Sequence, residues 1–173
     1  MRRTLLVLMS LLALAVVAPG AALAKKGGTD RPWKGKGSGT TTFSIATFPS
    51  FPGSTDGIAR FSHLGKTSNT STFTVTFTGP GTFNITGTQT LVAANGDTLT
   101  LSFTGAGTIT GAFGPGQTSE TMVTWNVTGG MGRFDDASGS LTGTVVTEVV
   151  SVDPVAMTAT GIHTFTAKGK ISY

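Results

Sequence analysis

Two histidines and one glutamate are the residues best suited to proton transfer in this sequence. His63 and His163 titrate close to neutral pH, so as a pair they could serve acid–base catalysis or bind a metal. They lie far apart in the chain and no third ligand accompanies them, so we predict no metal and no cofactor. Glu148 is the carboxylate that could join them as a proton carrier.

Alternation of apolar residues with threonine predicts the elements that must position these groups. Every second residue of the run 72–78 is apolar, which is typical of a strand with one buried and one solvated face. Similar runs recur as far as Tyr173, and turn signals such as Asn95-Gly96-Asp97 separate them. We expect strands at about residues 40–48, 57–63, 70–79, 81–94, 97–113, 120–129, 139–151 and 156–173.

This pattern predicts an all-β protein, a single eight-stranded antiparallel β-barrel. Glycines inside the long runs permit the sharp coiling of a closed sheet, and closure removes exposed strand edges. A barrel of this size is either filled by side chains or holds one small ligand. Small outer-membrane barrels have a similar length and also alternate, but they carry girdles of aromatic residues that this composition does not supply.

The phenylalanine side of each strand is expected to face inward, and it carries the candidate pocket residues. His63 shares this side with Phe61, and His163 shares it with Phe165. The predicted ligand-pocket residues are Phe61, His63, Gln89, Trp125 and His163. Thr147 shares the side of Val145 and Val149 in its strand. Glu148 is in the same strand, which is apolar on both faces, so the direction of its side chain stays open. A second interpretation makes each histidine a barrel-end residue that bonds to the backbone.

The N-terminus has the composition of a secretory signal. Met1-Arg2-Arg3 is followed by an apolar run and by Ala22-Leu23-Ala24, so we expect cleavage after Ala24 and a secreted product, extracellular or periplasmic. The predicted organisation is a signal peptide at 1–24, a basic glycine-rich disordered tail at 25–39 and a barrel domain at 40–173. No cysteine is present, so no disulfide stabilises the domain.

Positive charge is concentrated near the start of the expected mature chain. Residues 25–36 contain five basic residues and one acidic residue, whereas residues 37–173 contain five basic and seven acidic residues. We interpret the basic segment as a spacer, with a tether to polyanions as the alternative. The body shows no basic stripe interleaved with aromatic residues, so we predict no nucleic-acid partner and no stable membrane insertion once the signal is removed.

A glycine-rich segment between two predicted strands carries a family resemblance. The stretch 127–139 resembles the G-G-x-G-x-F-x-x-A-x-G turn of plant allene oxide cyclases, plant dirigent proteins and exported bacterial relatives. Further similar pieces are 62–66, 93–99 and the closing Gly-x-Ile-Ser-Tyr at 169–173. We assign a structural role to the residues of this turn that match the motif, which are Gly129, Gly130, Gly132, Phe134, Ala137 and Gly139.

The resemblance implies an eight-stranded antiparallel barrel and, in the plant proteins, chemistry inside it. Allene oxide cyclases isomerise a fatty-acid epoxide with an interior glutamate, and dirigent proteins steer phenoxy-radical coupling with acidic residues and tyrosine. No carboxylate of this sequence falls on the phenylalanine side of a strand, so such activity lacks a counterpart residue.

Three functions therefore stay open. The first is a non-catalytic exported barrel that binds a small apolar ligand. The second is an isomerase or cyclase for a hydrophobic substrate that uses His63, His163 or Glu148. The third is a structural extracellular or matrix protein. The resemblance also suggests a homo-oligomer, because plant relatives form trimers.

Overall fold

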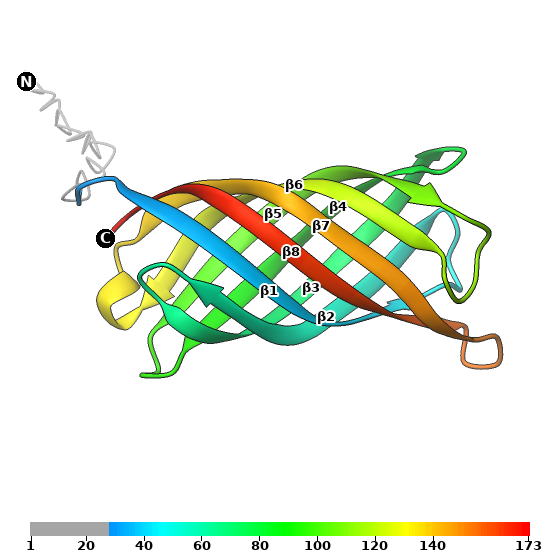
Figure 1. The fold of residues 1–173 in the computed structure, drawn as a ribbon, viewed down its shortest axis with the longest axis horizontal. Coiled ribbons are helices and arrows are strands. Elements are labelled where there is room, and N and C mark those ends of the chain that lie inside the picture. Colours follow the sequence, from blue (N-terminus) through cyan, green and yellow to red (C-terminus); the bar gives the residue numbers. More distant parts are fainter. Residues whose placement is uncertain (1–27) are drawn as a thin grey trace, which may run out of the picture.

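Eight long strands form one closed antiparallel barrel in the computed structural model, which describes residues 28–173 (Figure 1). Each strand pairs with its neighbours in sequence, and the last strand pairs with the first. The elements are β1 (Arg31–Ser44), β2 (Ser50–Phe61), β3 (Gly65–Gly79), β4 (Thr82–Ala93), β5 (Thr98–Thr110), β6 (Thr118–Met131), the short 3₁₀ helix η1 (Gly132–Phe134), β7 (Ser138–Asp153) and β8 (Thr158–Ser172). The predicted all-β barrel is confirmed.

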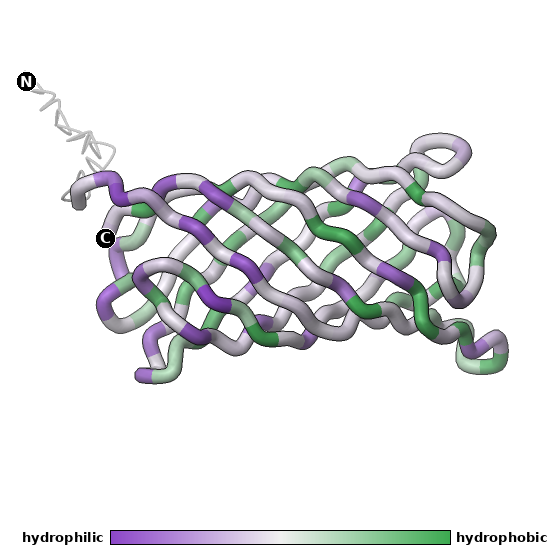
Figure 2. The backbone as a smooth tube through the Cα atoms, viewed as in Figure 1, coloured by the Kyte–Doolittle hydropathy of each residue, from purple (hydrophilic) through white to green (hydrophobic). Residues whose placement is uncertain are grey.

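Side chains alternate between the interior and the outer surface of the barrel wall, as the period of two requires. In β3, Phe73 is buried and its neighbour Thr72 is exposed. Threonine suits the outer wall because its branched Cβ fits a pleated strand and its hydroxyl meets water. The tube in Figure 2 is accordingly pale along most of the strands, with no long continuous hydrophobic stretch.

The first strand corrects the predicted domain organisation. The segment 31–39 was expected to belong to a disordered tail, but it forms most of β1 and pairs with both β2 and β8. Trp33 is fully buried, and the inward positions Gly35 and Gly37 leave the space that the rings of Phe61 and Phe165 fill. The sequence pattern predicted only the second part of this strand, from residue 40, because glycine occupies the inward positions 35, 37 and 39 of the first part. A Cβ at Gly35 would lie 2.1 Å from the Phe61 ring.

The two ends of the barrel differ. The end that carries both the C-terminus and η1 is filled by a packed core whose members include Trp33, Leu91, Leu99, Phe134 and Ile171, all completely buried. At the other end the strands are joined by the segments 45–49, 80–81, 111–117 and 154–157, seen on the right of Figure 1. We call these the closed end and the open end.

The predicted signal peptide at 1–24 lies outside the described residues. Within residues 28–173, no helix is long and apolar enough to cross a membrane.

Candidate functional site

A cavity of about 380 Å³ occupies the half of the barrel that faces the open end. Its floor is made by Phe103, Trp125 and Phe165. The ring centre of Trp125 lies 6.5 Å from that of Phe103 and 6.1 Å from that of Phe165. Its lining extends to Phe113, which is 56% exposed, in the segment that joins β5 to β6. The cavity therefore opens to solvent at this end.

Most of the wall is apolar. The strands β3 to β7 contribute the apolar side chains Val75, Ile85, Ile109, Val123, Val145 and Val149 to it, in addition to the floor rings. A cavity of this size and lining is typical of a site for a small organic molecule, because such sites hold their ligands mainly by burial of apolar surface. The physical contribution of burial is about 25 cal/mol for each Å² removed from water.

Uncharged polar side chains line the cavity on both sides, from β6 and β7 (for example Thr121 and Thr147) and, as a connected set, from β8 and β1 to β4. Strand register places Thr41 opposite Thr55, Thr55 opposite Ser71, and Ser71 opposite Gln89. The hydroxyl oxygens of Thr55 and Ser71 are hydrogen-bonded at 2.7 Å. All four side chains line the cavity, so they form a row of uncharged hydrogen-bonding groups.

The next row toward the floor adds two further polar groups on the same side. His163 lies opposite Gly39, Gly39 opposite Gly57, and Gly57 opposite Asn69. The two glycines have no side chain to fill the interior between His163 and Asn69. This row and the row above it define what we call the polar wall, which consists of Thr41, Thr55, Asn69, Ser71, Gln89 and His163.

His163 is held neutral by its surroundings. The ring is buried, and its Nδ1 lies 2.9 Å from the Thr41 hydroxyl oxygen. Burial lowers the pKa of His163 below its ordinary value of 6.5, because desolvation penalises the imidazolium form. At neutral pH the ring therefore offers one nitrogen donor and one nitrogen acceptor, with no charge.

Asn69 and Gln89 satisfy each other. The Gln89 side-chain amide donates to Oδ1 of Asn69 at 2.6 Å, and both residues are buried. Each amide retains further donor or acceptor capacity, because a primary amide can make up to four hydrogen bonds. These remaining positions are available to a ligand atom in the cavity.

No charged side chain is among the residues that line the cavity in the described part of the chain. A search of residues 28–173 for three or more clustered histidine, aspartate or glutamate side chains finds no group that could hold a metal ion. The chemistry available on the wall is therefore hydrogen bonding by neutral groups and proton exchange at His163.

The structure brings together three of the five predicted pocket residues. Gln89, Trp125 and His163 line the cavity. Phe61 faces inward but lies nearer the closed end, where its ring contacts Trp33 at 5.5 Å and Phe165 at 6.0 Å. Thr147, the further residue that shared the inward side, also lines the cavity.

His63 lies outside the cavity, contrary to expectation, and Glu148, whose direction the sequence left open, lies outside it too. His63 is in the turn between β2 and β3 with a positive φ of 74°, so the strand alternation that placed it inward ends before it. Its Nε2 is 2.9 Å from the carbonyl oxygen of Pro32, which matches the backbone-bonded interpretation. Glu148 is exposed on the outer surface of β7, because the inward positions of that strand are Thr147 and Val149.

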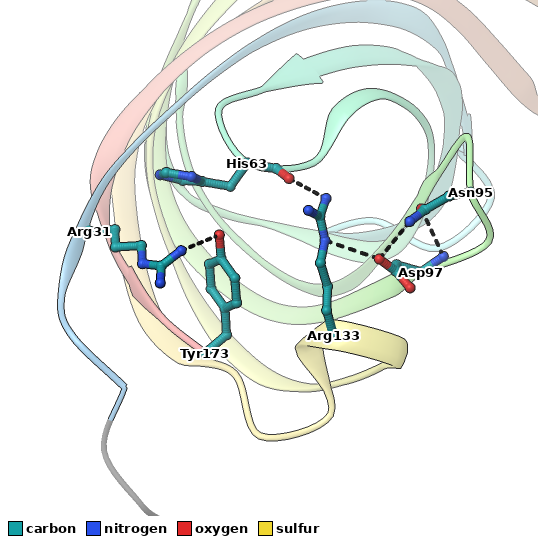
Figure 3. A network of polar contacts seen from close by, with 6 residues as sticks. All are labelled: Arg31, His63, Asn95, Asp97, Arg133 and Tyr173. Carbon is teal, nitrogen blue, oxygen red and sulfur yellow. Dashed lines mark hydrogen bonds and ion pairs between the residues drawn. The ribbon is translucent and has the colours of Figure 1, made fainter.

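The glycine-rich turn and the other similar pieces of the family resemblance meet at the closed end (Figure 3). Nε of Arg133 lies 3.0 Å from Oδ2 of Asp97, and its guanidinium also donates to the carbonyl of His63. Arg31 donates to the Tyr173 hydroxyl at 3.0 Å. Phe134 is completely buried and its ring lies 4.8 Å from the ring of Tyr173. These segments therefore close the barrel at the end opposite the cavity mouth.

Sequence reasoning missed four members of the polar wall, Thr41, Thr55, Asn69 and Ser71. Asn69 and Ser71 lie on the same side of β3 as Phe73, and Thr41 lies on the same side of β1 as Phe43. Strand alternation therefore indicated an inward position for these three residues. Thr55 shares the alternation of Phe51 and Phe61 in β2, but its nearest inward neighbours are glycines, which weakened the pattern.

Phenylalanine rings surround the mouth of the cavity. Phe51 and Phe77 line it, with ring centres 5.5 Å apart, and Phe48 packs on Phe77 at 6.1 Å. Phe48 remains 76% exposed in the segment that joins β1 to β2. An apolar molecule that enters the cavity would pass these rings first.

A scan of the chain against protein-family models finds no match, and searches of curated proteins and of solved structures return no similar protein.

Proposed function

We propose that this protein is an exported, non-catalytic barrel that binds a small, mainly apolar molecule bearing one uncharged polar group. The observation that carries the proposal is the open, mainly apolar cavity of about 380 Å³ whose wall also carries uncharged polar groups. Its volume is within the range of ligand pockets, which runs from roughly 300 to 1,000 Å³.

The absence of charge on the lining residues of the described chain defines the ligand class. A buried carboxylate without a cationic partner is strongly disfavoured, because desolvation is not compensated. A hydroxyl, carbonyl or amide can instead bond to Gln89, Asn69 or neutral His163. The ligand class that fits is therefore a neutral alcohol, ketone, ester or amide with an apolar body.

Binding, rather than turnover, is supported by the chemistry of the wall. The plant proteins whose glycine-rich turn the stretch 127–139 resembles use interior acidic residues, and the residues lining this cavity include none. The second candidate is an isomerase or cyclase for a hydrophobic substrate, and it rests on His163, the titratable group of the cavity wall.

Native mass spectrometry of protein purified gently from an exporting host tests binding and export together. A first mass corresponding to a chain that starts at Lys25 supports export with cleavage after Ala24. A discrete additional mass that is lost on organic extraction supports a bound apolar ligand. A clean mass of the chain alone, together with no uptake of added ligand, would contradict the binding proposal.

A pair of neighbouring substitutions in β7 tests whether the cavity is the site. Val145 lines the cavity and Val146 is 43% exposed on the outer surface. Val145→Phe places a ring in the cavity and should abolish ligand uptake. Val146→Phe adds the same atoms outside the wall, so it should bind as the unmodified protein does.

The ligand class is tested by titration with 1-dodecanol, dodecane and dodecanoate at pH 8. We expect the alcohol to bind most tightly and the ionised acid least tightly, by at least tenfold. Tightest binding of the carboxylate would overturn the assignment of a neutral ligand. Conversion of a bound epoxide or enone that is lost in His163→Phe but retained in His63→Phe would favour the cyclase.

A further inference from the structure

Six basic side chains share one area of the outer barrel surface. They project from four neighbouring strands, β8, β1, β2 and β3, in the half toward the closed end, and all are exposed. We call this area the basic face, and its residues are Lys34, Lys36, Arg60, Lys66, Lys168 and Lys170. Figure 2 shows hydrophilic stretches along β1 and β8 in this half of the barrel.

Strand register places like charges directly beside one another on this face. Lys36 is opposite Arg60, and Arg60 is opposite Lys66. Lys34 is likewise opposite Lys168 across the seam between β1 and β8. Neighbouring strands lie about 4.8 Å apart, so the Cα atoms that carry three of these cations follow one another at roughly 5 Å intervals across the wall. Like charges placed directly opposite each other destabilise a sheet.

Few carboxylates offset this charge. Asp56 is the only acidic residue on the four strands that form the basic face. Lys170 has a partner in Asp30 at 3.7 Å, and both of those side chains are largely exposed. Such an exposed pair contributes little. A row of cations that lowers stability and lacks counter-charges indicates selection for contact with an anion.

The surface between these cations is hollowed, and hydroxyl groups lie in it beside the apolar residues Ile58, Ala59 and Phe165. A shallow groove of about 600 Å³ is bordered by Lys36, Arg60 and Lys66. Ser38, Thr164 and Thr166 also line it. Hydroxyl groups beside cations can hydrogen-bond a polyhydroxylated chain while the cations neutralise its charges.

We propose that the basic face binds a linear anionic polysaccharide that carries carboxylate groups. The roughly 5 Å between these backbone positions is similar to the length of one sugar unit, so the long side chains of Lys36, Arg60 and Lys66 can each reach one of successive carboxylates. Single-stranded nucleic acid is disfavoured because no aromatic side chain on this face offers a stacking platform. A flat membrane is disfavoured because the barrel wall is convex and, among residues 28–173, Ile58 and Val92 alone are large exposed apolar side chains near the cations.

The experiment is a titration of the purified protein, its N-terminus verified by intact mass, with oligogalacturonate of ten units at 50 and 200 mM NaCl. We expect binding at low salt that weakens at least tenfold at the higher salt concentration. Lys36→Gln/Arg60→Gln/Lys66→Gln should weaken binding at 50 mM NaCl at least tenfold. Lys34→Gln/Lys168→Gln, as an independent second variant, should weaken it at least threefold.

The matched control changes net charge equally on the far wall. Thr86→Glu/Ala106→Glu/Asn126→Glu also lowers the charge by three, on β4, β5 and β6, and should bind within threefold of the unmodified protein. If this control loses as much affinity for oligogalacturonate as the glutamine variant, the effect depends on net charge alone and the proposed site is wrong. Melting temperatures at or above that of the unmodified protein are expected for the glutamine variants, because repulsion is relieved.

Two comparison ligands distinguish the other partners. Dextran, a neutral polysaccharide, should not bind. Binding to phosphatidylglycerol vesicles or to oligo-dT that is at least tenfold tighter than to oligogalacturonate would overturn the proposal and assign the basic face to a membrane or to nucleic acid.

Discussion

The Thr41 hydroxyl and Nδ1 of His163 lie 2.9 Å apart inside the barrel, on the two strands that close it. Thr41 comes from β1 and His163 from β8, so a buried polar pair lies at the seam between the first and last strands. Both side chains line the cavity, and their hydrogen bond satisfies polar groups that would otherwise be buried without a partner. The pair thus belongs both to the stability of the closed sheet and to the candidate ligand site.

Stability should fall as the pH drops below about 6.5. The pKa of His163 is lowered in the folded state by burial, so between 6.5 and that lower pKa the unfolded chain binds a proton that the folded chain does not. Chemical unfolding at pH 7.5 and 5.5 should show a smaller free energy of unfolding at the lower pH. His163→Gln should reduce this difference. An unchanged difference in the variant would assign the pH dependence to other groups.

Asn69 and Gln89 should behave as a coupled pair. Gln89→Leu alone leaves the buried amide of Asn69 without its partner, so it should lower the free energy of unfolding by about 1–3 kcal/mol. Asn69→Leu should act similarly. The double variant should cost less than the sum of the two, as measured in a double-mutant cycle by denaturant unfolding. Additive losses would show that the two amides stabilise the barrel independently.

Gly35→Ala tests whether the basic glycine-rich segment is part of the core. The new Cβ would lie 2.1 Å from the Phe61 ring, which is buried and packed against Trp33, so we expect a loss of about 1–3 kcal/mol. The control is Gly129→Ala: the motif predicted a structural role for this glycine, but a Cβ there meets no atom within 4 Å, so the change should stay within about 0.5 kcal/mol. Thermal unfolding of both variants provides the measurement. A neutral Gly35→Ala would support a detached tail.

Arg133→Ala should loosen the closed end. Arg133 contacts both Asp97 and the His63 carbonyl, so it joins three turns, and its loss should cost about 1–2 kcal/mol by denaturant unfolding. Arg133→Lys should restore only part of this, because a single ammonium cannot reproduce the guanidinium's two directed contacts.

Lys170→Ala is the control for Arg133, since its pair with Asp30 is exposed and should contribute less than about 0.5 kcal/mol. If Arg133→Lys has the same free energy of unfolding as the unmodified protein, the positive charge of Arg133 matters and its two directed contacts do not.

Strand alternation was informative wherever the inward residues are large and apolar. Gln89, Trp125 and His163 were predicted to face inward from neighbours such as Phe83 and Phe165, and they line the cavity. His63 was predicted to face inward because the alternation of β2 was extended beyond Phe61, where the strand ends and a turn begins. The first part of β1, residues 31–39, was missed because Gly35, Gly37 and Gly39 produce no hydrophobic period.

By itself, the sequence determined the all-β class and the number of strands, because both depend on local alternation and on turn residues that need no partner. Only the tertiary structure decided where the chain is hollow and where it is closed, since these depend on which side chains from eight strands meet in space. It also placed Lys34 and Lys36 beside Arg60, Lys66 and Lys168. Closure between β1 and β8 brings together residues more than a hundred positions apart, and no local pattern encodes that pairing.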